Sequence, residues 1–441
     1  MNNSLTQYID FFREHREVID AHSPAILNSR RDAALSFLVN LGRLPERGDE
    51  GYPKISLNEM FEPDYGFNIS RISFGKPEVT FGCDHPVSGR PAAMFVNDTF
   101  SAGNVQLPAG VEILTIKEAA EKYPRLIERQ IAPADNPVVA INDLMAQDGA
   151  FILIKSGSKI SKPIQILSVF NGSQPMMGVR KVIIHVEDGA SASVMMCDHP
   201  VAGAADHLSC RVVEATIGRD ASLRFYDLEE AESASRRATV FAAEQSENSV
   251  LKTCGLFLNG GMTRNEFYPK HLAEHCTTHL GGLVIGAGRQ TIDNSVVINH
   301  TQPGCSSEQL FKYALFDAAQ GSFEGMVKVS EGAVKTDAHQ SNRNLLASAD
   351  ARMYAMPQLE IYCDDVKASH GSATGQLDER ALFYMRQRGI PEGEARMMLV
   401  NAFMTDVLDT IDDDLLRERL RHLVDLRLRG AETVCSGCKN N

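Results

Sequence analysis

The stretch from Glu187 to Val194 reads EDGASASV, and units of the same kind return further along the chain. Each unit consists of a polar turn, a small residue and the start of a β-rich run. The others read GRDASLRF from Gly218, SENSVLK from Ser246, EHCTTHL from Glu274 and PGCSSEQL from Pro303. Their small residues recur at intervals of roughly 28 to 31 positions, a period typical of stacked repeats, and are Ala190, Ala221, Ser249, Thr277 and Ser306.

Short β-rich runs such as KVIIHV, SLRFYDL and SVVINH fill the region between Ala150 and Asp378, and no helix-length amphipathic segment interrupts them. Two architectures compete here, a β-sandwich and a β-solenoid. Small residues that recur in register allow successive coils to approach closely, whereas a sandwich needs many hairpins. Asn-Gly hairpin turns are sparse, with the NGG at Asn259 the main instance. The pattern therefore favours the solenoid.

Helical signals flank this region on both sides. Ser4 and Gln7 have the spacing of a capping box before an apolar helical stripe, and Asp378 is a suitable cap for a helix that ends at Gly389. These signals predict a helical or mixed N-terminal region over 1–145, a β-helix core over 146–376, a C-terminal helical domain over 377–430, and a disordered tail over 431–441.

Composition restricts the class of protein. The chain has 441 residues and a formal net charge of −13, and no Lys/Arg run compensates for it, so nucleic-acid binding is not expected. The N-terminus lacks the pattern of a secretory signal, and no apolar run is long enough to span a bilayer. We therefore expect a soluble cytoplasmic protein, whose nine cysteines are mostly buried thiols rather than a disulfide framework.

Motifs for nucleotide binding and nucleophilic catalysis are weak. The phosphate-loop pattern GxxxxGK[ST] does not occur, and GAGRQT at Gly286 has too few glycines for a dinucleotide site. Asp364, Ser369 and His370 make a catalytic triad only on paper, because neighbouring residues of a strand project to opposite sides. No catalytic residue is assigned.

Metal-binding motifs are also incomplete. HLAEHCTTHL places His275 and His279 close in sequence, but on a strand they lie roughly 13 Å apart, too far to share one ion. The similar segments CDHPVSG at Cys83 and CDHPVAG at Cys197 would make a zinc site only if the fold brought them together. A single CxxC lies in the tail, formed by Cys435 and Cys438.

A family resemblance enters at PQLEIYCDDVKASHGSATGQ, residues 357–376, which is followed by FYMRQRGI at 383–390. This region closely resembles the SufB/SufD family of the Suf iron–sulfur cluster assembly machinery, and its SufD branch in particular. A weaker similarity covers RRDAALSFLVNLGRLPERGDEGYPKIS, residues 30–56, and extends over effectively the whole chain.

The resemblance implies a mainly β fold, a right-handed parallel β-helix flanked by N-terminal and C-terminal α-helical domains. It also implies a non-catalytic scaffold that pairs with SufB and carries the SufC ATPase on its C-terminal helices, so that ATP chemistry belongs to the partner. Alone, the chain is expected to form a homodimer through the same solenoid edge.

One position distinguishes the two branches of the family. Where SufB carries its scaffold cysteine, this chain reads SNRNLL and has Asn342, a poor iron ligand beside a thiolate, so it resembles SufD. By resemblance, His370 in the S-H-G segment lies at the seam with SufB, where it would meet the nascent iron–sulfur cluster or iron. No cofactor is expected to be bound stably. Many SufD sequences have Cys before this segment, whereas this one has Ala368.

Two further sets of residues are candidates. Cys305 aligns with a cysteine of relatives and is a weaker metal ligand candidate, since a cysteine in a turn more often packs. The resemblance also implies a SufC docking surface with an aromatic pair flanked by arginines, formed by Leu382, Phe383, Tyr384, Arg386, Arg388, Gly389 and Ile390.

Two alternative functions remain open at this point. A SufB-type scaffold would assemble the cluster by itself, and Asn342 argues against it. A β-helix enzyme of the polysaccharide-lyase kind would need acidic and basic residues that converge in a groove of the solenoid.

Overall fold

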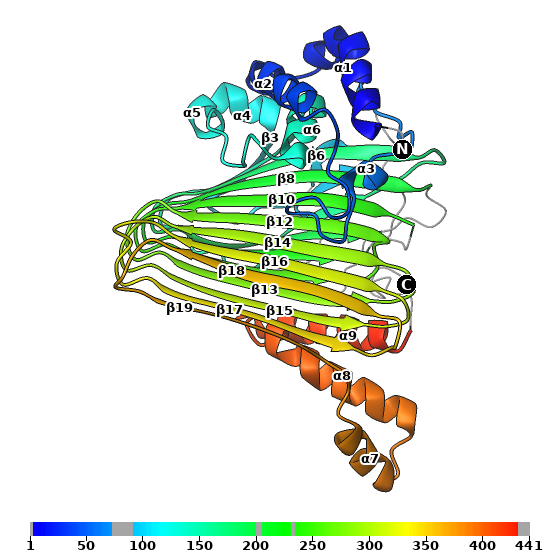
Figure 1. Ribbon diagram of the computed structural model, residues 1–441. Helices are drawn as coiled ribbons and strands as arrows, with labels where there is room; N and C mark the ends of the chain where they lie inside the picture. The colour runs from blue at the N-terminus through cyan, green and yellow to red at the C-terminus, as the bar shows by residue number, and fades with distance from the viewer. Residues whose placement is uncertain (1–2, 73–90, 104, 200–204, 231–233, 431–441) are drawn as a thin grey trace.

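The computed structural model describes residues 3–72, 91–103, 105–199, 205–230 and 234–430. Over these residues the strands form two long sheets that face each other (Figure 1). The ten-stranded sheet has the order β19 (Lys367–Gly375), β17 (Asp337–Leu346), β15 (Ser306–Leu315), β13 (Thr277–Gly286), β11 (Val250–Phe257), β9 (Ser222–Glu229), β7 (Ser191–His199), β5 (Ile164–Val169), β1 (Ala93–Val96), β2 (Thr99–Ala102). The nine-stranded sheet has the order β18 (Arg352–Ile361), β16 (Gln320–Val329), β14 (Thr291–His300), β12 (Met262–His271), β10 (Arg236–Gln245), β8 (His207–Ile217), β6 (Met176–Val186), β4 (Gly149–Ile154), β3 (Val111–Thr115).

From β4 to β19 the chain passes alternately from one sheet to the other, and each strand pairs in parallel with the strand two positions away in the sequence. Ser306, for example, lies opposite Thr277 on one side and Asp337 on the other. This is a parallel β-solenoid, as predicted. A sandwich is wrong, because among the described strands the antiparallel pairs are confined to β1–β2 and β3–β4.

One rim of the solenoid repeats a two-residue feature. A residue with φ of 55 to 67° is followed by a small buried residue, at Gly189–Ala190, Asp220–Ala221, Asn248–Ser249, His275–Cys276 and Gly304–Cys305. Glycine, asparagine and aspartate adopt this left-handed conformation more readily than other residues. The small positions predicted as Thr277 and Ser306 were therefore wrong by one residue, since the true positions hold cysteines.

The solenoid interior is apolar over most of its length. Five phenylalanines make ring contacts from coil to coil, with centroids 4.7 to 6.4 Å apart, and are Phe225, Phe241, Phe267, Phe311 and Phe323. Full burial of such a side chain stabilises a fold by about 1.5–3 kcal/mol. This phenylalanine stack is therefore a major part of the core.

Gly282 makes room for this stack. A Cβ atom at this position would lie 2.2 Å from the Phe311 ring. We expect Gly282→Ala to lower the free energy of unfolding by about 1–3 kcal/mol, because neither ring nor backbone can move without strain. Gly375→Ala is the matched control in the same sheet, since a Cβ there meets nothing within 4 Å. Urea titration of both variants measures the difference, and equal stability of the two would contradict the expectation.

A buried arginine cluster lies inside the earlier coils. Arg180, Arg211 and Arg237 come from the nine-stranded sheet and are at most 2% exposed, while Asp198 and Asp227 come from the ten-stranded sheet. Asp227 accepts two hydrogen bonds of 2.6 Å from Arg211 and another from Arg237, whose Nη1 also donates to Asp198 at 2.9 Å. The cluster therefore ties the two sheets together across the interior.

Six helices of the described N-terminal part cover the nine-stranded sheet and its end: α1 (Ser4–Ala21), α2 (Ala25–Leu41), α3 (Leu57–Met60), α4 (Ile116–Lys122), α5 (Pro124–Ile127) and α6 (Pro137–Met145). The apolar sides of α1, α2 and α6 share one cluster with the outer faces of β8 and β10. The predicted capping box of Ser4 and Gln7 is wrong. Asn3 caps α1, and Ser4 is buried and donates instead to Asn58. A tertiary partner has replaced the local one.

The C-terminal helices α7 (Glu379–Gln387), α8 (Glu392–Leu408) and α9 (Asp414–Leu428) lie on the other side of the solenoid (Figure 1). Helices α8 and α9 pack their apolar residues, such as Met404 and Leu420, on the outer face of the ten-stranded sheet. Lys312 Nζ binds Asp406 at 2.6 Å and secures this contact. Helix α7 projects beyond the sheet and contacts α8.

The predicted boundaries stay predictions, but the two sheets draw strands from further upstream than residue 146, since β1, β2 and β3 lie within 93–115. The predicted disordered tail, with Cys435 and Cys438, and the CDHP segment at Cys83 lie outside the described residues. None of the helices in the described part of the chain combines the length and the hydropathy of a membrane span.

Candidate functional site

The last strands of the two sheets lie together at one end of the solenoid, which we call the open end. Its edge strands are β18 and β19, and no described strand pairs with their outer edges. Every residue of β19 except Ala368 is exposed. Ile361, the last residue of β18, and Tyr362 after it are 41% and 67% exposed. Two adjacent strands with free backbone N–H and C=O groups are a template for strands of another chain.

His370 lies within β19, opposite Gln340 of β17. Side chains alternate along a strand, so His370 shares a face with Ser372 and Thr374. Ser372 donates to Asn342 at 3.1 Å, and Thr374 accepts from Asn344 at 3.1 Å. Since both asparagines are buried, this face of β19 is turned toward the solenoid interior. His370 therefore lies at the lip of the interior, within the last coil rather than in the joint to the helices.

A polar ladder extends inward from His370. In successive strands of the sheet, His370 lies opposite Gln340, Gln340 opposite Gln309, and Gln309 opposite Leu280, where the ladder becomes apolar. Gln340 Nε2 donates to Gln309 Oε1 at 2.9 Å. Gln340 Oε1 and Gln309 Nε2 are buried without a partner, which costs free energy in a closed core. The interior beneath His370 is thus lined by polar side chains at the open end.

The outer face of the same strand carries different chemistry. Ser369 Oγ lies 2.7 Å from His339 Nδ1, and His339 Nε2 lies 2.8 Å from Asp337. Ser369 and His370 are on opposite faces, as strand alternation predicts, so the triad of Ser369 and His370 with Asp364 is not assembled.

Asn342 is fully buried one coil inside the open end. Its amide donates to the Phe311 carbonyl at 3.4 Å and its oxygen accepts from Asn344 at 2.7 Å. An amide held in this way offers little to a soft metal ion.

The other candidate metal ligands are dispersed. Cys305 is buried in a rim turn, and no group of three or more potential ligands is found among the described residues. His271 is buried against His300, with ring centroids 4.5 Å apart. By contrast, His275 lies in a rim turn and His279 faces Glu308 on the outer surface. The fold separates the histidines of HLAEHCTTHL, but the prediction of a single strand is wrong, because His271 ends β12, His275 lies in the turn and His279 lies in β13.

The predicted docking residues lie on α7 and just after it. Phe383 and Tyr384 are 62% and 59% exposed. Arg388 donates to the Tyr384 hydroxyl at 2.9 Å and lies over its ring, and Arg386 pairs with Glu392 at 3.3 Å. We call the residues Phe383, Tyr384, Arg386 and Arg388 the α7 surface.

Leu382 differs from the other predicted docking residues, because it is 2% exposed and is not accessible to a partner in this structure. Gly389 has φ of 86° and Ile390 is half-buried, so both shape the turn into α8.

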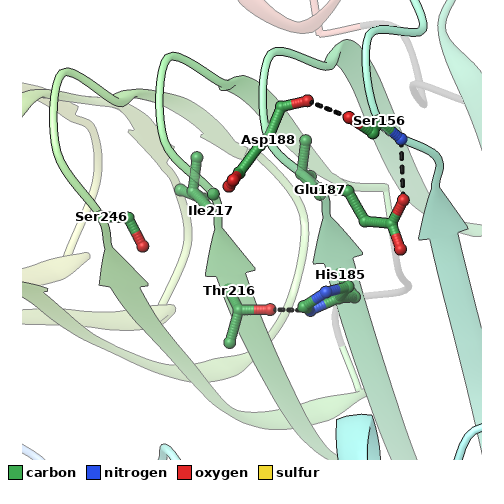
Figure 2. A pocket seen from close by; sticks show the side chains of 9 residues that line it. Ser156, His185, Glu187, Asp188, Thr216, Ile217 and Ser246 are labelled. Atoms are coloured by element: carbon green, nitrogen blue, oxygen red, sulfur yellow. Dashed lines mark hydrogen bonds between the residues drawn. The ribbon is translucent and has the colours of Figure 1, made fainter.

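A pocket of about 410 Å³ lies at the rim between β6 and β8 (Figure 2). The carboxylates of the pocket bind backbone N–H groups of the rim turns. Glu187 accepts a hydrogen bond from the Ser156 N–H, and Asp188 accepts one from the Arg219 N–H, both at 2.8 Å. His185 contacts Thr216, and burial lowers the pKa of its ring. The acidic groups stabilise backbone turns, so the converging acid and base of the lyase alternative are not provided here.

Sequence reasoning missed the polar ladder. A signal was present in QSNRN, where Gln340, Asn342 and Asn344 alternate as interior residues do but are polar. Alternation of this kind is normally read as the solvent face of a strand, so the pattern alone does not show that these side chains point inward.

Comparison with known proteins gives a consistent result over nearly the whole chain. A family model described as "SUF system FeS cluster assembly, SufBD core domain" matches residues 169–403, and one for the "SufBD protein N-terminal region" matches residues 2–166. The iron–sulfur cluster assembly protein SufD of Escherichia coli is 26% identical over 73% of this chain and 75% of its own length. SufD of Bacillus subtilis is 24% identical over 73% and 74%. A SufBD family protein of Synechocystis, slr0076, is 26% identical over 94% of both chains.

Proposed function

Because this chain belongs to the SufBD family of SUF-system iron–sulfur cluster assembly proteins, we propose that it is a SufD-type scaffold subunit that pairs with SufB and carries the SufC ATPase. The observation that supports this most directly is the open end, where two edge strands and an inward histidine lie together. The similarity to relatives named SufD favours this branch over a SufB-type scaffold.

Pairing with SufB would take place through β18 and β19. An extended partner strand added to each edge satisfies the free backbone groups and continues both sheets across the seam. The interior of the last coil faces water in the free chain and would face SufB in the pair. Polar side chains there suit both states. When SufB is absent, the same edges fit a second copy of this chain, because a two-fold axis pairs a surface with itself.

His370 would meet the nascent cluster, the cargo of the complex, at that seam. An imidazole is a competent ligand for iron. His370 is exposed in the free chain, and on pairing it would be enclosed between the last coil and SufB. It would then complete a site to which SufB contributes the remaining ligands.

SufC would dock on the α7 surface. Exposed aromatic residues beside arginines are enriched at the centres of protein interfaces. The α7 surface belongs to a helix that contacts α8, and α8 and α9 pack on the ten-stranded sheet. Movement of the ATPase would therefore be transmitted to the solenoid and from there to the seam.

We expect His370→Ala to reduce cluster formation by the complex with SufB and SufC by roughly 10-fold or more, which is the scale of losing a metal-site contact. The yield of the complex should stay unchanged, because His370 is exposed in the free chain. Ser369→Ala is the matched control, since Ser369 is the adjacent residue and points outward. The measurement is cluster absorbance after anaerobic reconstitution of the purified complex. Equal cluster yield from His370→Ala and wild type would contradict the ligand role.

Co-expression tests the scaffold role itself. Tagged SufB should retain this chain and SufC in one complex through affinity purification and gel filtration. A chain that purifies apart from SufB and SufC at every salt concentration would contradict the proposed function.

A further inference from the structure

Two cysteines occupy the same rim position in consecutive coils. Cys276 and Cys305 are the small buried residues that follow the left-handed residues of their turns. The next residues, Thr277 and Ser306, are paired in parallel register. Neighbouring strands lie about 4.8 Å apart, and the Cα atoms of disulfide-bonded cysteines are usually about 4.4–6.8 Å apart. The backbone therefore places the two cysteines at a separation that a disulfide can bridge.

The two thiols also converge. Cys276 Sγ lies 3.2 Å and Cys305 Sγ 3.3 Å from the same acceptor, the carbonyl oxygen of Ala273. The neighbouring Cys305 side chain lowers the pKa of the Cys276 thiol, and the pKa of Cys305 is raised. Burial instead raises the pKa of Cys210 and Cys254 to about 12. A lowered thiol pKa favours the thiolate, the form in which cysteine reacts.

The pair lies in the rim turns, close to the surface. Both cysteines are buried, but Glu274 and His275, the two residues before Cys276, are exposed. We consider hydrogen peroxide as the oxidant, because it is close to water in size. Thiolate character and a nearby resolving thiol are the features of peroxide-sensitive cysteines.

We propose that Cys276 and Cys305 form a peroxide-reactive dithiol that closes a disulfide between consecutive coils of the solenoid. The Cys276 thiolate attacks one oxygen of hydrogen peroxide, the O–O bond breaks, and the departing hydroxide takes a proton to become water. The Cys305 sulfur then attacks the resulting sulfenic sulfur and gives up its thiol proton, the S–O bond breaks, and the departing hydroxide takes that proton to leave as a second water. The two thiols are oxidised by two electrons, and the peroxide is reduced to two waters. The proposal does not depend on the proposed function.

The experiment uses the full-length, fully reduced protein with hydrogen peroxide as the probe. After exposure the protein is denatured in an alkylating reagent and digested, and the peptides are identified by mass. We expect the peptides that contain Cys276 and Cys305 to be recovered as one linked species, lighter by two hydrogen atoms than the two reduced peptides together. The rate of linkage should rise with pH, because the thiolate is the form that attacks the peroxide.

Two variants separate the pair from the other thiols. In Cys305→Ala, oxidation should stop at a sulfenic acid on Cys276, which dimedone labels. In Cys254→Ala, the matched removal of a buried thiol from the neighbouring strand β11, the linkage should form as in wild type. The wild-type measurement stands by itself if a variant does not fold. The proposal is overturned if both cysteines remain alkylatable under conditions that oxidise free cysteine to cystine, or if Cys276 links to another thiol.

Discussion

Replacing Asp227 by Asn should lower the free energy of unfolding by about 3–5 kcal/mol, the usual result of removing one partner from a buried ion pair. Asp227 is 3% exposed and accepts from both Arg211 and Arg237. Asparagine keeps the shape of the side chain but removes its charge. The three buried guanidinium groups, those of Arg180, Arg211 and Arg237, would then share a single carboxylate, that of Asp198.

The state of Asp198 shows how strongly the cluster favours negative charge. Burial by itself would raise its pKa, but the three arginines lower that pKa to about 2. Asp198 is therefore ionised at any ordinary pH, and it stays paired with the arginines when Asp227 is replaced.

Asp412→Asn is the matched control for Asp227→Asn. Asp412 also joins two cations, Lys252 and Arg224, each at 3.0 Å, but its side chain is 44% exposed. Exposed pairs of this kind contribute about 0–1 kcal/mol. Guanidinium titration followed by circular dichroism measures both variants. Similar losses in the two would mean that the buried cluster is no more important to stability than a surface pair.

Truncating both aromatic side chains of the α7 surface, Phe383→Ala with Tyr384→Ala, should weaken SufC binding by roughly 30-fold or more. One interface anchor of this type contributes about 2 kcal/mol or more, and a factor of ten corresponds to about 1.4 kcal/mol, so a single anchor among the two accounts for about 30-fold and a second would add to it. Both side chains are more than half exposed, so the free energy of unfolding should change by no more than about 0.5 kcal/mol.

Val39→Ala is the control for this double variant. Val39 is an exposed apolar residue, 45% accessible, on α2 at the opposite side of the solenoid. It should leave SufC binding unchanged. Titration calorimetry with purified SufC measures the affinities, and a double variant that binds SufC like wild type would remove the α7 surface from the docking model. Such a result would not bear on the proposed seam with SufB or on the proposed role of His370.

The repeat in the sequence was sufficient to predict a parallel solenoid, because its period reflects a backbone geometry that every coil must satisfy. Its register was predicted less well. A glycine identifies the left-handed residue of the turn at Gly189 and Gly304, but the histidine at 275 does not. Both Cys276 and Thr277 are small enough for the position that follows. The error of one residue concealed that Cys276 and Cys305 are neighbours.

By itself the sequence determined the class of fold, the flanking helices, and the assignment of Ser369 and His370 to opposite faces, since these follow from local periodicity and turn chemistry. The tertiary structure alone decided which of those faces is the interior, because that depends on Gln340 and Asn344 in a neighbouring coil. It also decided that the two edge strands lie at one end and that α7 projects from the sheet. These features depend on contacts between residues far apart in the chain, which a period along the sequence does not contain.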